Sequence, residues 1–120
     1  MTAKPPHADC LFCRIARKEA PAAVIFEDEW MLAFEDIHPQ APVHTLIIPK
    51  EHYASLAEVA EKDAALLGNL LLRARELAHQ KGLDARGYRI VLNTGPDSGQ
   101  AVFHIHFHLL GGRRMGWPPG

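Results

Sequence analysis

Histidines and large apolar residues alternate strictly in the segment 104–109, which reads His-Ile-His-Phe-His-Leu. A period of two is the period of a β-strand, in which successive side chains point to opposite faces. The pattern predicts a strand whose apolar residues enter a core while His104, His106 and His108 share one accessible face. A neutral imidazole suits nucleophilic attack, proton transfer and metal ligation. We therefore expect this face to carry the chemistry of the protein.

Length and charge restrict the class of protein. A chain of 120 residues forms one domain. With 13 basic and 14 acidic residues, its charge balance does not favour nucleic acid or an anionic membrane as partner. No apolar run approaches the roughly 20 residues of a membrane span, and the segment 1–9 lacks the apolar core of a secretory signal. We expect a cytoplasmic protein.

The remaining pattern predicts an α+β fold. A short helical turn is expected over 10–17 and a long helix from the Ser55/Glu58 capping box to about Lys81, ended by Gly82. The segments that read as strands are 24–27, 30–34, 43–48, 88–93 and 101–110. This order predicts a five-stranded, mainly antiparallel sheet covered by one long helix, with a short N-terminal helix. Residues 1–9 are expected to form a flexible tail.

Cys10 and Cys13 are separated by two residues. Such a pair supplies half of a tetrahedral zinc site, which histidine nitrogens usually complete. A redox pair is the second interpretation, although the chain lacks the βαβ context of a thioredoxin-like motif. Two reduced thiols without metal are the third.

Three stretches resemble one known family. The run 99–112, Gly-Gln-Ala-Val-Phe-His-Ile-His-Phe-His-Leu-Leu-Gly-Gly, is similar to the signature of the histidine-triad (HIT) superfamily. The segment 34–50 resembles the ribose-side loop and strand of that family, and the ending Trp-Pro-Pro-Gly at 117–120 resembles its HINT branch of nucleoside phosphoramidases. The resemblance covers residues 10–120, which we expect to form one HIT domain.

The resemblance implies a nucleotide-binding hydrolase. It would cleave the P–N bond of adenosine or other purine nucleoside 5′-phosphoramidates through a nucleotidyl-histidine, without a catalytic cofactor, and as a homodimer. His106 matches the nucleophile of the family, and His108 matches the residue that contacts the phosphate and helps handle the leaving-group proton. His44 and His104 match histidines that orient the nucleophile.

The same resemblance implies a nucleotide pocket. Asp36 would accept hydrogen bonds from the ribose hydroxyls. The implied nucleotide-binding residues are Phe12, Ile15, Phe34, Asp36, Ile37, Asn93, Gly99, Gln100, Ala101, Val102, His106, His108 and Trp117. Simpler interpretations stay open, because Phe34 and Ile37 are also typical core residues, Asp36 and Gly99 are typical turn residues, and Trp117 is also typical of a loose tail.

In a subset of bacterial relatives a similar cysteine pair binds structural zinc, which implies the ligand set Cys10, Cys13, His52 and His104 here. The chain also departs from the pattern of the HINT branch. Ala101 replaces a serine common near the leaving group, and Gly116 replaces a histidine often found before the final Trp-Pro-Pro-Gly.

Other functions remain open from the sequence. The same histidine chemistry would hydrolyse dinucleoside polyphosphates, and a chain that had lost turnover would serve as a nucleotide-binding or interaction module. A third hypothesis makes the three alternating histidines one transition-metal site. We expect His7, His38 and His79 to be structural or solvent-facing.

Overall fold

The computed structural model describes residues 9–120, so His7 and all but the last residue of the expected tail lie outside the described part. In chain order the helices and strands are α1 (Leu11–Ala16), β1 (Val24–Glu27), β2 (Met31–Glu35), β3 (Val43–Pro49), α2 (Ala64–Gln80), β4 (Tyr88–Leu92) and β5 (Phe107–Gly111). Within residues 9–120, no helix has both the length and the apolar character that crossing a bilayer requires.

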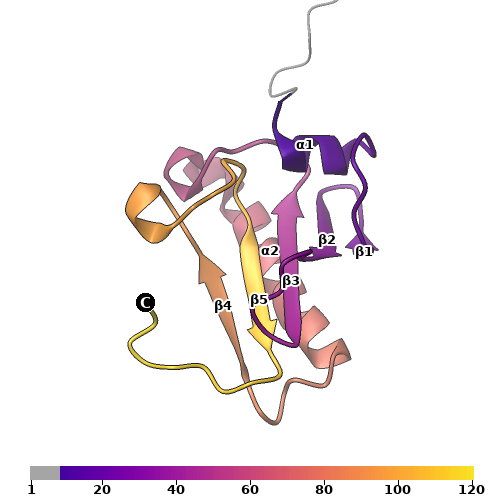
Figure 1. The fold of residues 1–120 in the computed structure, drawn as a ribbon. Coiled ribbons are helices and arrows are strands. Elements are labelled where there is room, and N and C mark those ends of the chain that lie inside the picture. The colour runs from indigo at the N-terminus through magenta and orange to yellow at the C-terminus, as the bar shows by residue number, and fades with distance from the viewer. Residues whose placement is uncertain (1–8) are drawn as a thin grey trace, which may run out of the picture.

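The five strands form one antiparallel sheet in the order β1-β2-β3-β5-β4 (Figure 1), which confirms the predicted fold class. Strand β3 lies in the middle, between β2 and β5. In the β3–β5 register Leu46 lies opposite His108, and His44 lies opposite Leu110. Because side chains alternate across a strand, this register brings His44 and His108 to the same face as diagonal neighbours.

Each face of the sheet is covered by one helix. The α2 face buries a cluster that includes Ala33, Ile47, Phe107 and Leu109 from the strands, with Leu70, Ala74 and Leu77 from the helix. The α1 face buries Phe12, Ile15, Leu32, Phe34, Leu46 and Ile48. Each fully buried aliphatic side chain contributes about 1.5–3 kcal/mol. A one-residue slip of β5 would expose Phe107 and Leu109 together, so this packing fixes His108 on the α1 face.

The long helix is shorter than its sequence pattern predicts. It begins at Ala64, after two short 3₁₀ helices, η1 (Leu56–Glu58) and η2 (Glu61–Asp63). The Ser55 hydroxyl does accept the N–H of Ala57 at 3.2 Å, but Val59 has an extended backbone and ends the turn. The capping box therefore closes a single 3₁₀ turn. The other end agrees with the prediction, since the helix stops at Gln80, just before Gly82.

The expected strand over 101–110 is also wrong in its first half, because pairing with β3 and β4 begins only at Phe107. Residues 99–106 form a loop that is tied instead to the segment after β3, where the N–H of Ile105 donates to the carbonyl of Tyr53 at 2.7 Å. The three histidines do not share one accessible face, and His104 is fully buried. The ring of His104 contacts the two cysteines, His52 and the Pro49 carbonyl, so it does not share a face with His106 and His108.

Candidate active site

A hollow of about 740 Å³ lies between α1, the loop after β2 and the histidine end of β5. Ten of the residues expected to bind nucleotide line it: Phe12, Ile15, Phe34, Asp36, Ile37, Gly99, Ala101, Val102, His106 and His108. Phe34 is both pocket wall and core residue, since it is buried, whereas Ile37 is 83% exposed at the rim. One end of the hollow is apolar and the other carries the histidines.

Three residues of the expected set do not line the hollow. Trp117 is 82% exposed on the C-terminal tail, and Asn93 lies half-buried after β4. Gln100 is buried and directs its side chain to backbone groups of the protein. The lining also includes His38 and Gln40, which were not expected at the site from the sequence. Their place in the Pro39/Pro42 loop was the only sequence signal for them.

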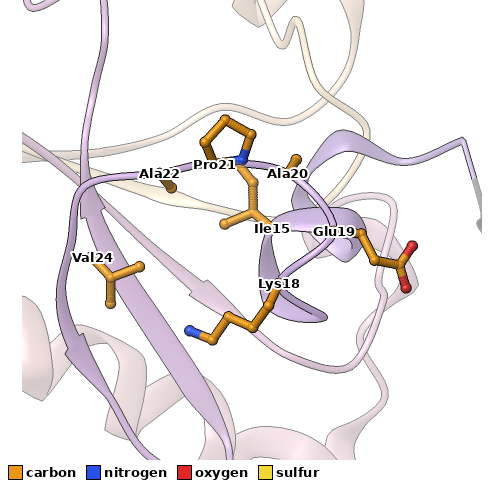
Figure 2. Close-up of a pocket in the computed structure, with 7 residues that line it drawn as sticks. All are labelled: Ile15, Lys18, Glu19, Ala20, Pro21, Ala22 and Val24. Atoms are coloured by element: carbon orange, nitrogen blue, oxygen red, sulfur yellow. The ribbon is translucent and has the colours of Figure 1, made fainter.

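At its apolar end, the hollow is separated from a second hollow by only a few residues. Ile15 and the segment 20–22 line both the large hollow and a second hollow of about 520 Å³. Figure 2 shows Ile15 between Pro21 and Lys18, with the lysine on the far side from Pro21. The Lys18 ammonium is paired with the carboxylate of Glu27. The charge of this lysine is therefore held outside the large hollow.

His106 is held in one tautomer. Its Nδ1 lies 2.7 Å from the carbonyl oxygen of His104. A carbonyl only accepts, so Nδ1 carries the hydrogen and donates it, and Nε2 keeps a free lone pair. Burial lowers the pKa of His106, which favours the neutral ring. The ring packs edge-on against Phe12, with centroids 5.0 Å apart. The result is a rigid imidazole whose unprotonated nitrogen is suited to nucleophilic attack.

Hydrogen bonds also fix the tautomers of His44 and His108. The backbone N–H of Gln40 donates to His44 Nδ1 at 3.0 Å, so the hydrogen of His44 is on Nε2. That Nε2–H lies 2.9 Å from His108 Nδ1 and 3.4 Å from a carboxylate oxygen of Asp36. His108 therefore accepts at Nδ1 and carries its own hydrogen on Nε2. We call Asp36, His44 and His108 the relay cluster.

Burial keeps the rings of the relay cluster uncharged. It lowers the pKa of His108 to about 4, assisted by the neighbouring His106 and His44 rings. Burial also lowers the pKa of His44, against the opposing pull of the Asp36 and Glu35 carboxylates. Near neutral pH the relay cluster therefore offers a neutral N–H donor at His108 rather than an imidazolium.

A separate set of four side chains lies at the end of β3. Cys10 and Cys13 come from the start of α1, His52 from the segment after β3, and His104 from the loop before β5. Their ligand atoms all lie within 4.8 Å of one another. The sulfur of Cys13 is 3.2 Å from His52 Nδ1 and 3.4 Å from His104 Nδ1, and the two Nδ1 atoms are 3.2 Å apart. We call this set the Cys/His cluster.

The Cys/His cluster fits a tetrahedral zinc ion. Zinc bond lengths imply edges of about 3.3 Å between two nitrogens and about 3.6 Å between sulfur and nitrogen, close to the separations found. His104 Nε2 donates to the carbonyl of Pro49 at 2.8 Å, which leaves Nδ1 unprotonated and directed at the cysteines. Burial, together with the adjacent Cys10, raises the pKa of the Cys13 thiol to about 11.

The relay cluster does not fit a metal in the same way, although its three ligand atoms also lie within 4.8 Å of one another. The Gln40 N–H occupies the lone pair of His44 Nδ1, so His44 Nε2 carries the hydrogen and has no lone pair to offer. Within residues 9–120, no metal-type group joins His104, His106 and His108. The three alternating histidines thus have three different sets of partners.

The chain belongs to the HIT family. The HIT domain family model matches residues 17–115. The crystal structure of a HIT family hydrolase from Legionella pneumophila superposes with a TM-score of 0.91 and 58% identity, covering 92% of this chain and 99% of that one.

Two curated relatives add chemical information. A 14 kDa zinc-binding protein of Zea mays is 53% identical over 92% of this chain and 87% of its own length. Adenylylsulfatase HINT1 of Arabidopsis thaliana is 48% identical over the whole of this chain and 82% of its own length. The names of these relatives agree with a hydrolase of the HIT type and with a zinc-type Cys/His cluster.

Proposed function

We propose that the protein hydrolyses the P–N bond of adenosine or other purine nucleoside 5′-phosphoramidates through a nucleotidyl-His106 intermediate. The observation that carries the proposal is the bond from His106 Nδ1–H to the His104 carbonyl. It directs the free lone pair of Nε2 to the reaction and gives the developing imidazolium charge an acceptor, as nucleophilic catalysis requires.

The two steps balance with one water molecule. His106 Nε2 attacks the α-phosphorus, an N–P bond forms, and the bond to the leaving nitrogen breaks with its electron pair. The departing nitrogen takes a proton from a water molecule and leaves as the amine, and the hydroxide that remains attacks phosphorus and releases neutral His106. The products are the nucleoside monophosphate and the free amine.

The relay cluster supports this chemistry without supplying a net proton. Its rings are neutral, so a proton lost from His108 would leave an imidazolate at His108 or His44. We infer that His108 Nε2–H acts as a fixed hydrogen-bond donor to the reacting phosphoryl group and to the departing nitrogen. His44 holds the donating tautomer of His108 in place.

The apolar end of the hollow suits a purine. Phe12, Ile15, Phe34 and Leu46 offer apolar surface there. Asp36 stands between this end and His44, with one oxygen accepting the N–H of His38 and the other near His44. We propose that the ribose hydroxyls donate to this carboxylate, which would place the α-phosphorus beside His106.

The charges of the lining favour substrates with little phosphate charge. Among the described residues, no lysine or arginine lines the hollow, whereas Glu35 and Asp36 do. Dinucleoside polyphosphates would bring two or more phosphate charges to a site without cationic side chains. A single phosphoryl group needs only backbone N–H donors and His108. This lining favours phosphoramidate hydrolysis over polyphosphate hydrolysis.

Hydrolysis of adenylyl sulfate is the second candidate activity. It is favoured by the name of the Arabidopsis relative, an adenylylsulfatase. The nucleophilic step at the α-phosphorus would be the same, and only the leaving group would change. A nucleotide-binding module without turnover is the remaining alternative, and the positioned Nε2 of His106 argues against it.

We propose that zinc binds Cys10, Cys13, His52 and His104 in a structural role. Four protein ligands close the coordination shell, so a bound ion would tie α1 to the segment before β5 and leave no open position for substrate. The chemistry would remain with the histidines.

We also propose a homodimer. Within residues 9–120, β4 pairs only with β5, and its residues, including Ile90 and Val91, are half-buried. An unpaired strand edge with apolar side chains is a natural surface for pairing with a second copy. Light scattering coupled to gel filtration measures the mass directly, and a monomer across micromolar concentrations would refute this proposal.

Turnover of adenosine 5′-phosphoramidate by three proteins tests the proposed function. We expect wild type and His79→Gln to release AMP at equal rates, because His79 is exposed and pairs only with Asp84 among the described residues. We expect His106→Ala to lose at least 10³-fold in kcat, since the covalent route is removed. Turnover by His106→Ala at the wild-type rate would refute the mechanism.

A further inference from the structure

Gln100 is a buried polar residue whose amide joins three separate backbone positions. Its Oε1 accepts the N–H of Gly95 at 2.9 Å. Its Nε2 donates to the carbonyl of Ala54 at 2.7 Å and to that of Val102 at 3.1 Å. The residue is 6% exposed and does not line the hollow. Its side chain therefore contacts the protein rather than the substrate.

The bonds of Gln100 span the loop that leads to the histidines. This loop runs from Gly95 to residue 106, contains η3 (Pro96–Ser98) and has no strand pairing. Gly95 and Gly99 both have φ near +84°, a conformation that side-chain-bearing residues rarely adopt. Within the described part of the chain, the other hydrogen bonds of residues 95–100 join these residues only to one another and do not tie them to the rest of the protein. The Gln100 amide provides cross-links that a strand ladder would otherwise supply.

The same amide sets the loop relative to the rest of the site. Ala54, whose carbonyl accepts from Gln100, lies in the segment after β3. The carbonyl of the neighbouring Tyr53 accepts the N–H of Ile105. Gly99, Ala101 and Val102, on both sides of Gln100, line the hollow that contains His106 and His108. The backbone that faces the phosphoryl position is thus anchored through Gln100 at one end and through Ile105 at the other.

We propose that Gln100 is a positioning residue for phosphoryl transfer, which holds the backbone N–H groups of Ala101 and Val102 in place to receive the phosphoryl oxygens. The N–H groups of Gly99 and Gln100 already donate to the carbonyls of Pro96 and Gly95. The inference rests on the proposed function. Charge on those oxygens grows in the transition state, so donors fixed in advance act mostly on kcat. A loose loop would still bind the ground state, because the base and ribose contacts lie elsewhere in the hollow.

Two substitutions and a control separate this role from general stabilisation. Gln100→Met keeps the volume and removes all three bonds. Gln100→Glu keeps the acceptor for Gly95 and places a carboxylate against the carbonyls of Ala54 and Val102. Gln80→Met is the control, because Gln80 is an exposed residue at the end of α2.

The measurement is kcat for adenosine 5′-phosphoramidate per AMP-binding site, with sites counted by calorimetry so that unfolded protein does not contribute. We expect Gln100→Met to lower kcat by about 10- to 100-fold while KM and the AMP Kd change less than about threefold. Gln100→Glu should lose at least as much, and Gln80→Met should match wild type. A kcat per site within twofold of wild type for Gln100→Met would overturn the proposal.

Amide hydrogen exchange provides a readout that does not depend on turnover. We expect Gln100→Met to speed exchange of the Gly95 amide at least tenfold and to leave the β3 amides unchanged. Unchanged exchange at Gly95 would overturn the positioning role even if wild type shows no turnover. If wild type shows no turnover but Gly95 exchanges faster in the variant, the proposed function is refuted, whereas the role of Gln100 in holding the loop stands. The two failures are thus distinguishable.

Discussion

The Cys/His cluster and the relay cluster look alike as collections of ligand atoms, yet a single hydrogen bond makes them chemically different. In the Cys/His cluster, His104 donates from Nε2 to a carbonyl, which leaves Nδ1 unprotonated and directed at the cysteine sulfurs. In the relay cluster, His44 accepts a backbone N–H at Nδ1 and must keep its hydrogen on Nε2. The comparison teaches that the partner of the second ring nitrogen decides whether a histidine is a ligand or a donor.

The largest effect is expected from Cys13→Ser in the Cys/His cluster. Since metal binding contributes directly to folding free energy, this variant should lose bound zinc and about 3 kcal/mol or more of stability. Metal analysis of the purified protein and urea unfolding measure both quantities. Wild type should carry one zinc per chain, and His79→Gln should match it.

The comparison would fail if Cys13→Ser kept a full zinc equivalent. It would fail equally if wild type, prepared without chelator in zinc-containing medium, carried none. The hypothesis of one metal site at His104, His106 and His108 predicts the opposite pattern, in which His106→Ala rather than Cys13→Ser removes the metal.

The second prediction concerns the relay cluster. His108→Gln should lower kcat for adenosine 5′-phosphoramidate by about 10²-fold, because a fixed N–H donor to the phosphoryl group is displaced. Zinc content should stay at the wild-type value, since His108 lies outside the Cys/His cluster. Loss of zinc in this variant would show that the two clusters are not independent.

The pattern of the sequence predicted the fold well and the histidine segment only in part. The alternation of Phe107 and Leu109 with His108 holds, because the core under α2 requires it. The alternation at His104 fails, since partners far apart in the chain, Cys13 and His52, determine where that ring points. Period and propensity describe neighbours along the chain and carry no information on such contacts.

The candidate site shows the same division between local and distant information. The resemblance named residues such as Asp36 and Phe12 that do line the hollow. It placed Gln100 against the nucleotide, whereas the structure turns this side chain toward Gly95 and Ala54. Which way a buried amide points depends on the backbone groups left unpaired around it, and those appear only once the loop is folded.

The third prediction is a pH dependence of stability. An unfolded histidine titrates near pH 6.5, whereas the pKa of His108 in the folded protein is about 4. Between these values the unfolded chain binds a proton that the folded chain does not, so stability falls as the pH falls through this window. We expect His108 to account for about 1 to 2 kcal/mol, allowing for screening of a ring that is not fully buried.

Urea unfolding at about pH 7 and about pH 4.5 measures this loss. The comparison of wild type with His108→Gln cancels acid effects on the Cys/His cluster, which both proteins share. The variant should lose less stability than wild type over this window. Equal losses would mean that His108 does not stay neutral in the folded protein.

The smallest effect is expected at Ala101, which lines the hollow and stands where the resemblance implies a serine near the leaving group. The neutral rings of the relay cluster supply no net proton, so Ala101→Ser should add a hydroxyl that helps protonate the leaving amine and raise kcat by about two- to fivefold. Steady-state kinetics with a series of amines of different basicity would show the gain growing with leaving-group basicity. A uniform change across the series would place the hydroxyl away from the leaving group.

The central claim is that the middle histidine of the three is the nucleophile while its neighbours serve the two clusters. Intact-protein mass spectrometry of a rapid-quench reaction, stopped without acid after mixing with adenosine 5′-phosphoramidate, tests it most directly. We predict a transient adenylyl adduct on wild type and on the folded fraction of Cys13→Ser. We predict no adduct on His106→Ala. An adduct on His106→Ala, or turnover by wild type with no adduct at any time, would contradict the account.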